Sequence, residues 1–285
     1  MASKSSTPHK QKFLAVLIDA DNAPAAIVEA LFEEIAKYGV ASVRRIYGDW
    51  TKPNLGSWKK VLLDHSIQPI QQFAYTSGKN STDSALIIDA MDLLYTRRFD
   101  GFCLVSSDSD FTRLAARIRE EGLTVYGFGE QKTPSPFVSA CDKFIYTEIL
   151  RAAALKQPPE APSTEKLAAA AAGQVEEADK RSSKPLGKTD AINCQQVPVD
   201  FIARVLDDLS EEDDWIQLGT LGQNISKLRP AFDPRLYGCK KLSELIAAEP
   251  KRFELESRGS SATGGLDLYV RLRKPDKQGR AGKRR

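Results

Sequence analysis

The sequence contains little histidine and little cysteine. It has 2 histidines and 4 cysteines in 285 residues. His9 lies in a polar amino-terminal segment, which leaves His65 alone in a patterned region. Catalysis by a Ser-His-Asp or Cys-His arrangement, or by a histidine-rich zinc site, therefore has almost nothing to use. Any hydrolytic chemistry has to depend on carboxylates.

Long apolar runs and paired cysteines are also missing. Cys103, Cys141, Cys194 and Cys239 lie far apart and form no Cys-x-x-Cys pair, which argues against a zinc site or a disulfide framework. No apolar run approaches the ~20 residues of a membrane span, and the first residues, MASKSSTPHKQK, are polar. We expect a cytoplasmic protein with reduced thiols and no membrane partner.

Residues 12–150 alternate short apolar runs with amphipathic stretches. The strand-like runs are FLAVLID, SVRRIYGDW, IQPIQQFAY, GFCLVSS, LTVYGFG and KFIYTEI. The helix-like segments are AAIVEALFEEIAKYG, DSALIIDAMDLLYTRR and FTRLAARIREEG. This alternation predicts an α/β domain with a mainly parallel sheet and helices on both faces. In such sheets the working site lies at the carboxyl ends of the strands.

The composition then changes, which predicts further divisions of the chain. Residues 151–190 are rich in Ala, Pro, Lys, Glu and Ser without apolar periodicity, as expected of a flexible linker. Residues 191–273 contain three compact helical patterns and two strand-like runs, RFELES and LDLYVRL, which together describe a small winged helix. Residues 274–285 form a basic tail suited to a polyanion or to solubility.

Acidic residues follow two of the apolar runs. Asp19, Asp21 and Asn22 come directly after FLAVLI, and Asp108 and Asp110 come after FCLVSS. Both groups should therefore lie at the carboxyl edge of the sheet. They would repel each other unless a hard divalent cation neutralised them, and Mg²⁺ or Mn²⁺ is the natural candidate.

A third acidic contribution comes from the segment KNSTDSALIIDA. Thr82 is suited to cap a helix there, which places Asp83 in the first turn. Asp89 lies six residues further on, about 240° around the helix, so it ranks as a weaker candidate. Lys79 is close enough in sequence to hold a phosphate. Any one aspartate alone is better explained as a cap or turn residue, but the combination favours a metal site.

These residues also carry a family resemblance. The segments IDADNAP, KNSTDSALIIDAMDL and LVSSDSDFTRLAARIREEGLTVYGFG resemble the NYN domain, a PIN-like nuclease fold also found in the LabA-like (DUF88) group. The resemblance covers residues 12–150. It implies a metal-dependent ribonuclease with Asp19, Asp83, Asp108 and Asp110 as catalytic metal ligands, supported by Asp21, Asn22 and Asp89. NYN-like domains often pair, so a homodimer is one candidate assembly, but the sequence does not determine the oligomeric state.

The second domain resembles the OST-HTH domain, also called LOTUS, and the segment YGCKKLSELI is its most specific piece. The resemblance implies binding of RNA, or of protein in some members. Cations around the expected recognition helix are candidates for phosphate contacts, as are lysines that interleave with Trp50 and Trp58 in the first domain. These candidates are Lys52, Lys59, Lys60, Lys227, Arg235, Lys240 and Lys241. A core position for Trp58 and a solvated face for the lysines explain the same pattern.

Three hypotheses about function remain at this point. The first is a metal-dependent ribonuclease, expected to cut internally, with a tethered RNA-binding winged helix. The second is a non-catalytic adaptor for RNA or protein with a vestigial metal site. The third, a phosphatase or glycosyltransferase that uses Asp-x-Asp, ranks last because Asn22-Ala23-Pro24 follows the second aspartate where a phosphatase needs Thr or Ser.

Overall fold

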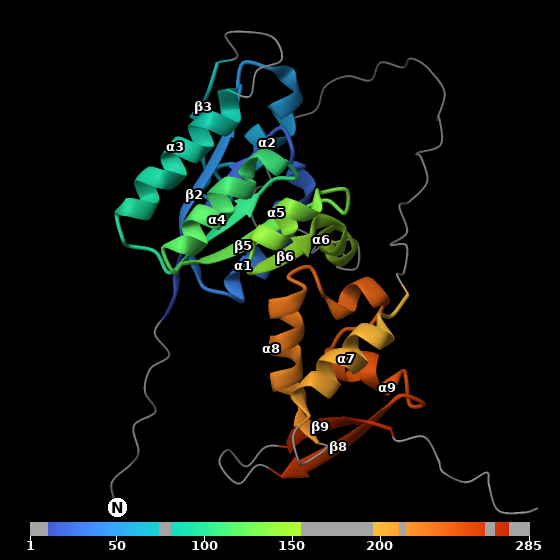
Figure 1. The fold of residues 1–285 in the computed structure, drawn as a ribbon. Coiled ribbons are helices and arrows are strands. Elements are labelled where there is room, and N and C mark those ends of the chain that lie inside the picture. Colours follow the sequence, from blue (N-terminus) through green and yellow to red (C-terminus); the bar gives the residue numbers. More distant parts are fainter. Residues whose placement is uncertain (1–10, 74–80, 155–195, 211–214, 260–265, 274–285) are drawn as a thin grey trace, which may run out of the picture.

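The computed structural model describes residues 11–73, 81–154, 196–210, 215–259 and 266–273. They form an α/β domain followed by a smaller helical domain with its own sheet (Figure 1). Lys79, Cys194, most of the expected linker and the basic tail lie outside the described residues.

A parallel sheet of six strands, counted over the described residues, forms the centre of the first domain. Its spatial order is β3-β2-β1-β4-β5-β6, and every neighbouring pair is parallel. The strands are β1 (Phe13–Asp19), β2 (Val40–Gly48), β3 (Gln68–Gln71), β4 (Gly101–Val105), β5 (Thr124–Gly129) and β6 (Lys143–Tyr146). The parallel α/β fold predicted from the sequence is confirmed.

The central strands are buried on both faces because their apolar residues run without interruption. In β1, Leu14, Val16 and Ile18 pack into one hydrophobic cluster, while Ala15 and Leu17 pack into a second cluster on the opposite face. Side chains alternate across a strand, so a continuous apolar run serves both clusters.

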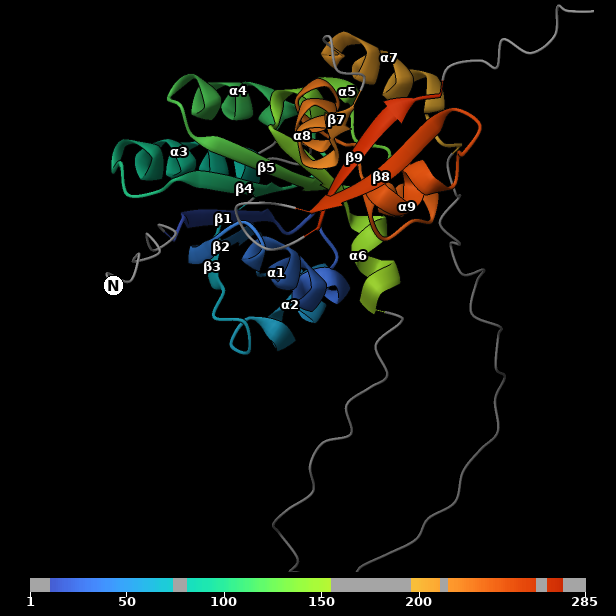
Figure 2. The same cartoon turned by 90° about the horizontal axis from the view of Figure 1, so that it is seen from below.

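Helices cover the two faces of the sheet in separate layers (Figure 2). One layer contains α1 (Val28–Ala36), α2 (Gly56–Val61) and α6 (Thr147–Ala154). The other contains α3 (Ser81–Tyr95), α4 (Thr112–Glu120) and α5 (Ser135–Ala140). Short 3-10 turns precede three of these helices: η1 (Ala25–Ile27), η2 (Pro53–Leu55) and η3 (Ser109–Phe111).

The second domain packs its helices on one face of an antiparallel sheet with the order β7-β9-β8. Its elements are α7 (Val199–Leu209), β7 (Ile216–Gln217), α8 (Leu218–Leu228), η4 (Pro234–Tyr237), α9 (Leu242–Ala247), β8 (Phe253–Gly259) and β9 (Leu266–Leu272). The third helical pattern of this region, RLYGCKKLSELIAAEP, is divided into η4 and α9. The division occurs because Gly238 ends η4 in the left-handed conformation at φ 79°. The predicted helical region with a β-hairpin is present, and β7 adds a short third strand.

Two smaller expectations concern membranes and thiols. Among the described helices, none combines the length and the apolar character needed to cross a membrane. Cys103, Cys141 and Cys239 form no disulfide within the described part of the chain, and the first two are buried.

Candidate metal centre

Two neighbouring strands and one helix bring the predicted acidic residues together. Asp19 is the last residue of β1, and β4 pairs with β1 up to Ile18 and Val105. The loop that follows β4 carries Asp108 and Asp110, while Asp83 lies in the first turn of α3. Parallel strands end at the same edge, so the sheet itself places these side chains at one site.

Asp83, Asp108 and Asp110 form a compact carboxylate cluster. One oxygen from each can be chosen so that all three lie within 4.8 Å of one another. Asp108 caps η3, and its side chain accepts a hydrogen bond of 2.9 Å from the backbone N–H of Asp110. This turn therefore brings the carboxylates of Asp108 and Asp110 to the same side of the loop. Asp110 is exposed, whereas Asp83 is only 9% exposed.

Asp19 stands beside this cluster in a deeper position. It is 1% exposed, and its carboxylate accepts hydrogen bonds from the Asn22 side chain at 2.6 Å and from the Ser106 hydroxyl at 2.8 Å. The backbone N–H of Asp21 donates a third at 3.1 Å. Burial raises the pKa of Asp19, and these hydrogen bonds oppose that rise. Asn22, which the family resemblance implied as a supporting residue, thus contacts Asp19 directly.

Ser106 is a residue that the sequence reasoning missed. Its hydroxyl donates to Asp19 and also accepts a hydrogen bond of 3.1 Å from the backbone N–H of Asp108. Ser106 therefore joins the two acidic segments. Its position directly after β4, beside the end of β1, was the available signal.

The cluster carries an excess of negative charge. Burial, together with repulsion from Asp19, Asp108 and Asp110, raises the pKa of Asp83 to about 6. Oxygen ligands that lie close together and disfavour one another's ionisation are the donor set that Mg²⁺ or Mn²⁺ takes. The residues present therefore fit a hard divalent cation.

Asp89 is not brought to the cluster. It lies further along α3, where it pairs with the Arg45 guanidinium and accepts a hydrogen bond from the Tyr47 hydroxyl. Both partners are on β2. The six-residue separation from Asp83 explains this direction, because the two side chains emerge from different sides of the helix.

Asp21 and Lys52 lie in the loops that border the site. The side chain of Asp21 accepts a hydrogen bond of 3.3 Å from Asn54. Lys52 is 3.9 Å from the carboxylate of Asp49, a buried acid directly after β2. The Asp49 carboxylate also accepts hydrogen bonds from the Thr51 hydroxyl at 2.6 Å and the Gln71 amide at 3.0 Å, so it holds a loop together.

The tryptophans that suggested an RNA groove are structural. Trp58 is 1% exposed and donates its indole N–H to the Ala23 carbonyl at 2.9 Å. Trp50 donates to the Ile70 carbonyl at 3.0 Å. The core interpretation of Trp58 is confirmed. Lys59 and Lys60 are exposed on the short helix α2.

The cations predicted as RNA contacts on the second domain differ in their exposure to solvent. Lys227, Lys240 and Lys241 are exposed to solvent. Arg235 is half-buried and contacts two acidic residues, Glu34 and Asp233. The structure thus leaves three of the four cations on the surface.

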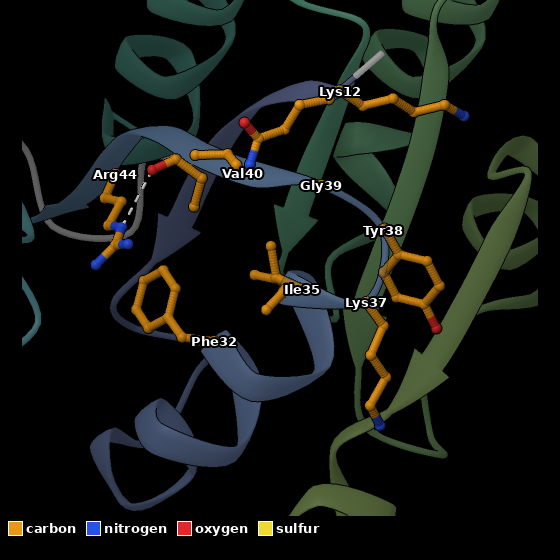
Figure 3. Close-up of a pocket in the computed structure, with 11 residues that line it drawn as sticks. Lys12, Phe32, Ile35, Lys37, Tyr38, Gly39, Val40 and Arg44 are labelled. Carbon is orange, nitrogen blue, oxygen red and sulfur yellow. Dashed lines mark hydrogen bonds between the residues drawn. The ribbon is translucent and has the colours of Figure 1, made fainter. Parts of the chain in front are cut away.

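A separate groove of about 810 Å³ lies between α1 and the start of β2 (Figure 3). Its described lining contains three cations, Lys12, Lys37 and Arg44, and no acidic residue. Two of these cations already have partners: Lys37 contacts Glu34 at 2.7 Å, and Arg44 donates to the His65 carbonyl at 2.7 Å. The groove is distinct from the carboxylate cluster and does not contribute to it.

Two domain models and two solved structures are similar to parts of the chain. The NYN domain model matches residues 13–150, and the OST-HTH/LOTUS domain model matches residues 193–264. A solved structure of a protein of unknown function from Vibrio parahaemolyticus is 18% identical, with a TM-score of 0.41, over 50% of this chain and 96% of that one. An uncharacterized protein from Nitrosomonas europaea, solved by NMR, is 33% identical, with a TM-score of 0.28, over 36% of this chain and 100% of that one.

No curated protein matches the chain. The two domain models follow each other along the sequence and agree with the α/β domain and the smaller domain described above. The chain therefore belongs to the NYN-domain proteins of the PIN-like nuclease superfamily, with an OST-HTH/LOTUS domain as its second domain.

Proposed function

We propose that the protein is a metal-dependent ribonuclease that hydrolyses phosphodiester bonds at the carboxylate cluster. The observation that carries this proposal is the convergence of Asp83, Asp108 and Asp110 within 4.8 Å, at the carboxyl edge of an NYN domain. A phosphodiester is anionic, so an uncompensated acidic cluster would repel it. A bound cation removes that conflict.

The residues of the chain divide the task between them. Asp83, Asp108 and Asp110 would hold the Mg²⁺ or Mn²⁺ ion, which when bound lowers the pKa of a water and stabilises charge on the phosphate. Asp19 adds a nearby negative charge and fixes Asn22 and Ser106 at the floor of the site. No histidine is required as a general base.

RNA is favoured over DNA by the second domain. OST-HTH/LOTUS domains are associated with RNA binding, whereas metal-bound carboxylates alone cut either polymer. The exposed Lys227, Lys240 and Lys241 would contact phosphates. Binding at the second domain would raise the local concentration of RNA at the cluster.

The test is cleavage of labelled single-stranded and structured RNA, with matched DNA, in Mg²⁺, Mn²⁺ or chelator. Wild type is compared with Asp83→Asn, and Asp92→Asn serves as the matched control because Asp92 is an exposed acid on the same helix. We expect metal-dependent RNA cleavage that Asp83→Asn abolishes and Asp92→Asn retains. RNA binding without cleavage in any metal would instead favour the non-catalytic adaptor.

A further inference from the structure

The two domains contact each other directly, although the matched domain regions are separated by more than 40 residues. The end of α8 faces the α/β domain in Figure 1. The segment after α8 reaches the edge strand β6, where the backbone N–H of Phe144 donates to the Pro230 carbonyl at 2.9 Å. Ala231 packs against the hydrophobic cluster of the α/β domain. An edge strand has unpaired backbone groups, and this segment satisfies one of them.

An ion-pair cluster reinforces the contact. Arg235 makes a two-pronged contact with Glu34 on α1, with Nη1–Oε2 and Nη2–Oε1 distances of 2.9 and 3.1 Å. Asp233 holds the other edge of the same guanidinium, with an Nη2–Oδ2 distance of 2.6 Å. The Glu34 side chain is 4% exposed and also accepts hydrogen bonds from Tyr38 at 2.9 Å and Lys37 at 2.7 Å.

This arrangement does not suit Arg235 as an RNA contact. Its guanidinium lies between two carboxylates, and their negative charge would oppose an approaching phosphate. If the domains separated, Glu34 would lose its bidentate partner, although it would keep Lys37 and Tyr38. Bidentate, charge-assisted hydrogen bonds are among the stronger ones in proteins, so their loss opposes separation.

The docked position also sets the distance between the two functional surfaces. Glu34 lies near the end of α1, which follows β1 through η1 and returns along the sheet toward the strand beginnings. The carboxylate cluster lies at the opposite edge, where the strands end. The second domain is therefore held near the end of the sheet away from the metal centre.

We propose that the Glu34–Arg235–Asp233 cluster docks the OST-HTH domain on the α/β domain as one unit. We further propose that this docking fixes the spacing between the RNA segment held by the second domain and the phosphodiester that is cut. The first half stands on the contacts alone, whereas the second half rests on the proposed nuclease function. A freely tethered domain would give no fixed spacing.

Docking is tested on the full chain with Glu34→Arg, Arg235→Glu and the double variant, with Glu33→Arg as control because Glu33 is the exposed neighbour on α1. Small-angle X-ray scattering and ¹⁵N relaxation report the separation and independent tumbling of the domains. We expect both single variants to open the molecule and the double variant to close it again, at least in part. Glu33→Arg should behave as wild type.

Circular dichroism establishes that each variant is folded. If Arg235→Glu does not fold, Arg235→Gln, which places no like charge beside Glu34, gives the decisive measurement. Folded single variants with wild-type scattering and tumbling would overturn the docking proposal. Open single variants that the double variant does not close would overturn the role given to the ion pair.

The spacing is tested by mapping cleavage sites on a long labelled RNA and on an oligonucleotide too short to reach the second domain. Glu34→Arg is compared with Glu33→Arg, so both carry the same added charge. We expect unchanged cleavage of the short RNA, but a broader distribution of cut positions on the long RNA for Glu34→Arg alone. An unchanged distribution would overturn the spacing. If wild type cuts no RNA, the nuclease proposal and the spacing fall together, while the scattering result still decides docking.

Discussion

At the scale of single residues, Asp19 is the most constrained acid of the site. Its carboxylate is almost completely buried but has three hydrogen-bond donors, which favour the ionised form against desolvation. An amide at this position keeps the shape but removes the charge and one acceptor. Asp19→Asn therefore tests the charge of this side chain at nearly constant shape.

We predict that Asp19→Asn lowers RNA cleavage by about a hundredfold or more, as expected when a preorganised charge at an active site is lost. The fold should remain, as judged by circular dichroism. Measured turnover in Mn²⁺ for wild type and Asp19→Asn decides the matter. Full activity of the folded variant would remove Asp19 from the mechanism.

Asp83 gives a pH-dependent prediction for the metal-free protein. Its folded pKa of about 6 lies above its ordinary value of 3.8, so its contribution to stability is present below pH 3.8 and is lost as pH rises through about 6. The difference corresponds to at most about 3 kcal/mol. Asp83→Asn does not titrate and should therefore gain stability relative to wild type between pH 4 and 7.

Thermal unfolding of both proteins in chelator, across that pH range, measures this difference. Adding Mn²⁺ at pH 7 should raise the Tm of wild type more than that of Asp83→Asn, because only the intact cluster holds the ion fully. A constant difference in Tm between the two proteins across pH would show that the pKa of Asp83 is not raised by folding.

The positions of Asp19, Asp83, Asp108 and Asp110 at one edge of the sheet could be predicted from the sequence, because each stands just after a recognisable apolar run or at a helix start. The contacts of Ser106 and Asp89 were harder to predict. Ser106 also follows an apolar run, but its contact with Asp19 depends on β4 lying beside β1, and the local sequence pattern does not show which strands pair. The direction of Asp89 depended on Arg45 and Tyr47 from β2, which compete for its carboxylate.

At the scale of elements, the end of β5 supports the loop that carries the site. A Cβ atom added at Gly129 would lie 2.6 Å from the Ser106 carbonyl oxygen and 2.7 Å from the Thr133 hydroxyl. The backbone N–H of Ser106 also donates to the Phe128 carbonyl at 2.9 Å. The absence of a side chain at Gly129 thus lets β5 approach the segment that leads to Asp108.

We predict that Gly129→Ala destabilises the protein by about 1–3 kcal/mol, because the added methyl group has to displace backbone. It should also lower metal-dependent cleavage, since Ser106 and Asp108 would move together. Gly56→Ala is the control, because no atom lies within 4 Å of the Cβ added there. Chemical unfolding checks the first effect. Equal stability of the two variants would show that the segment after β4 shifts to accommodate the added methyl group without a measurable cost.

The long elements could be predicted from sequence, whereas the short ones could not. Strands β1 and β4 and helices α1, α3 and α4 have clear apolar patterns over five or more residues. The two-residue strand β7 is too short to show a period, and it exists because Ile216 pairs with Val270. The division between η4 and α9 depends on the left-handed Gly238.

At the scale of the whole molecule, the sequence predicted two domains joined by a flexible linker. It also predicted Arg235 as a phosphate contact for RNA. Glu34 lies beside Leu31 and Ile35 on the buried face of α1, so a cation partner could be expected for it. The partner is 201 residues away in the sequence, beyond the reach of any local pattern. Only the tertiary structure joins the two.

Acid should release the docked domain. Burial alone would raise the pKa of Glu34, but hydrogen bonds from Arg235 and Lys37 and the charge of Arg235 lower it to about 2, below its ordinary value of 4.5. The stabilisation from this shift is therefore present above pH 4.5 and is lost as pH falls toward about 2, on the order of 3 kcal/mol in total. This is the reverse of the direction for Asp83: stabilisation from Asp83 is lost as pH rises from 3.8 to about 6, whereas stabilisation from Glu34 is lost as pH falls from 4.5 to about 2.

Small-angle scattering between pH 7 and 3, with circular dichroism on the same samples, measures the release. Wild type should stay docked to about pH 4.5 and open below it before the secondary structure is lost. Glu34→Gln carries no titrating carboxylate here and should show a scattering profile that changes little over this range. An opening of Glu34→Gln at the same pH as wild type would assign the release to other acids. Because Asp233 holds the same guanidinium, Asp233→Asn would then be the variant that separates its contribution from that of Glu34.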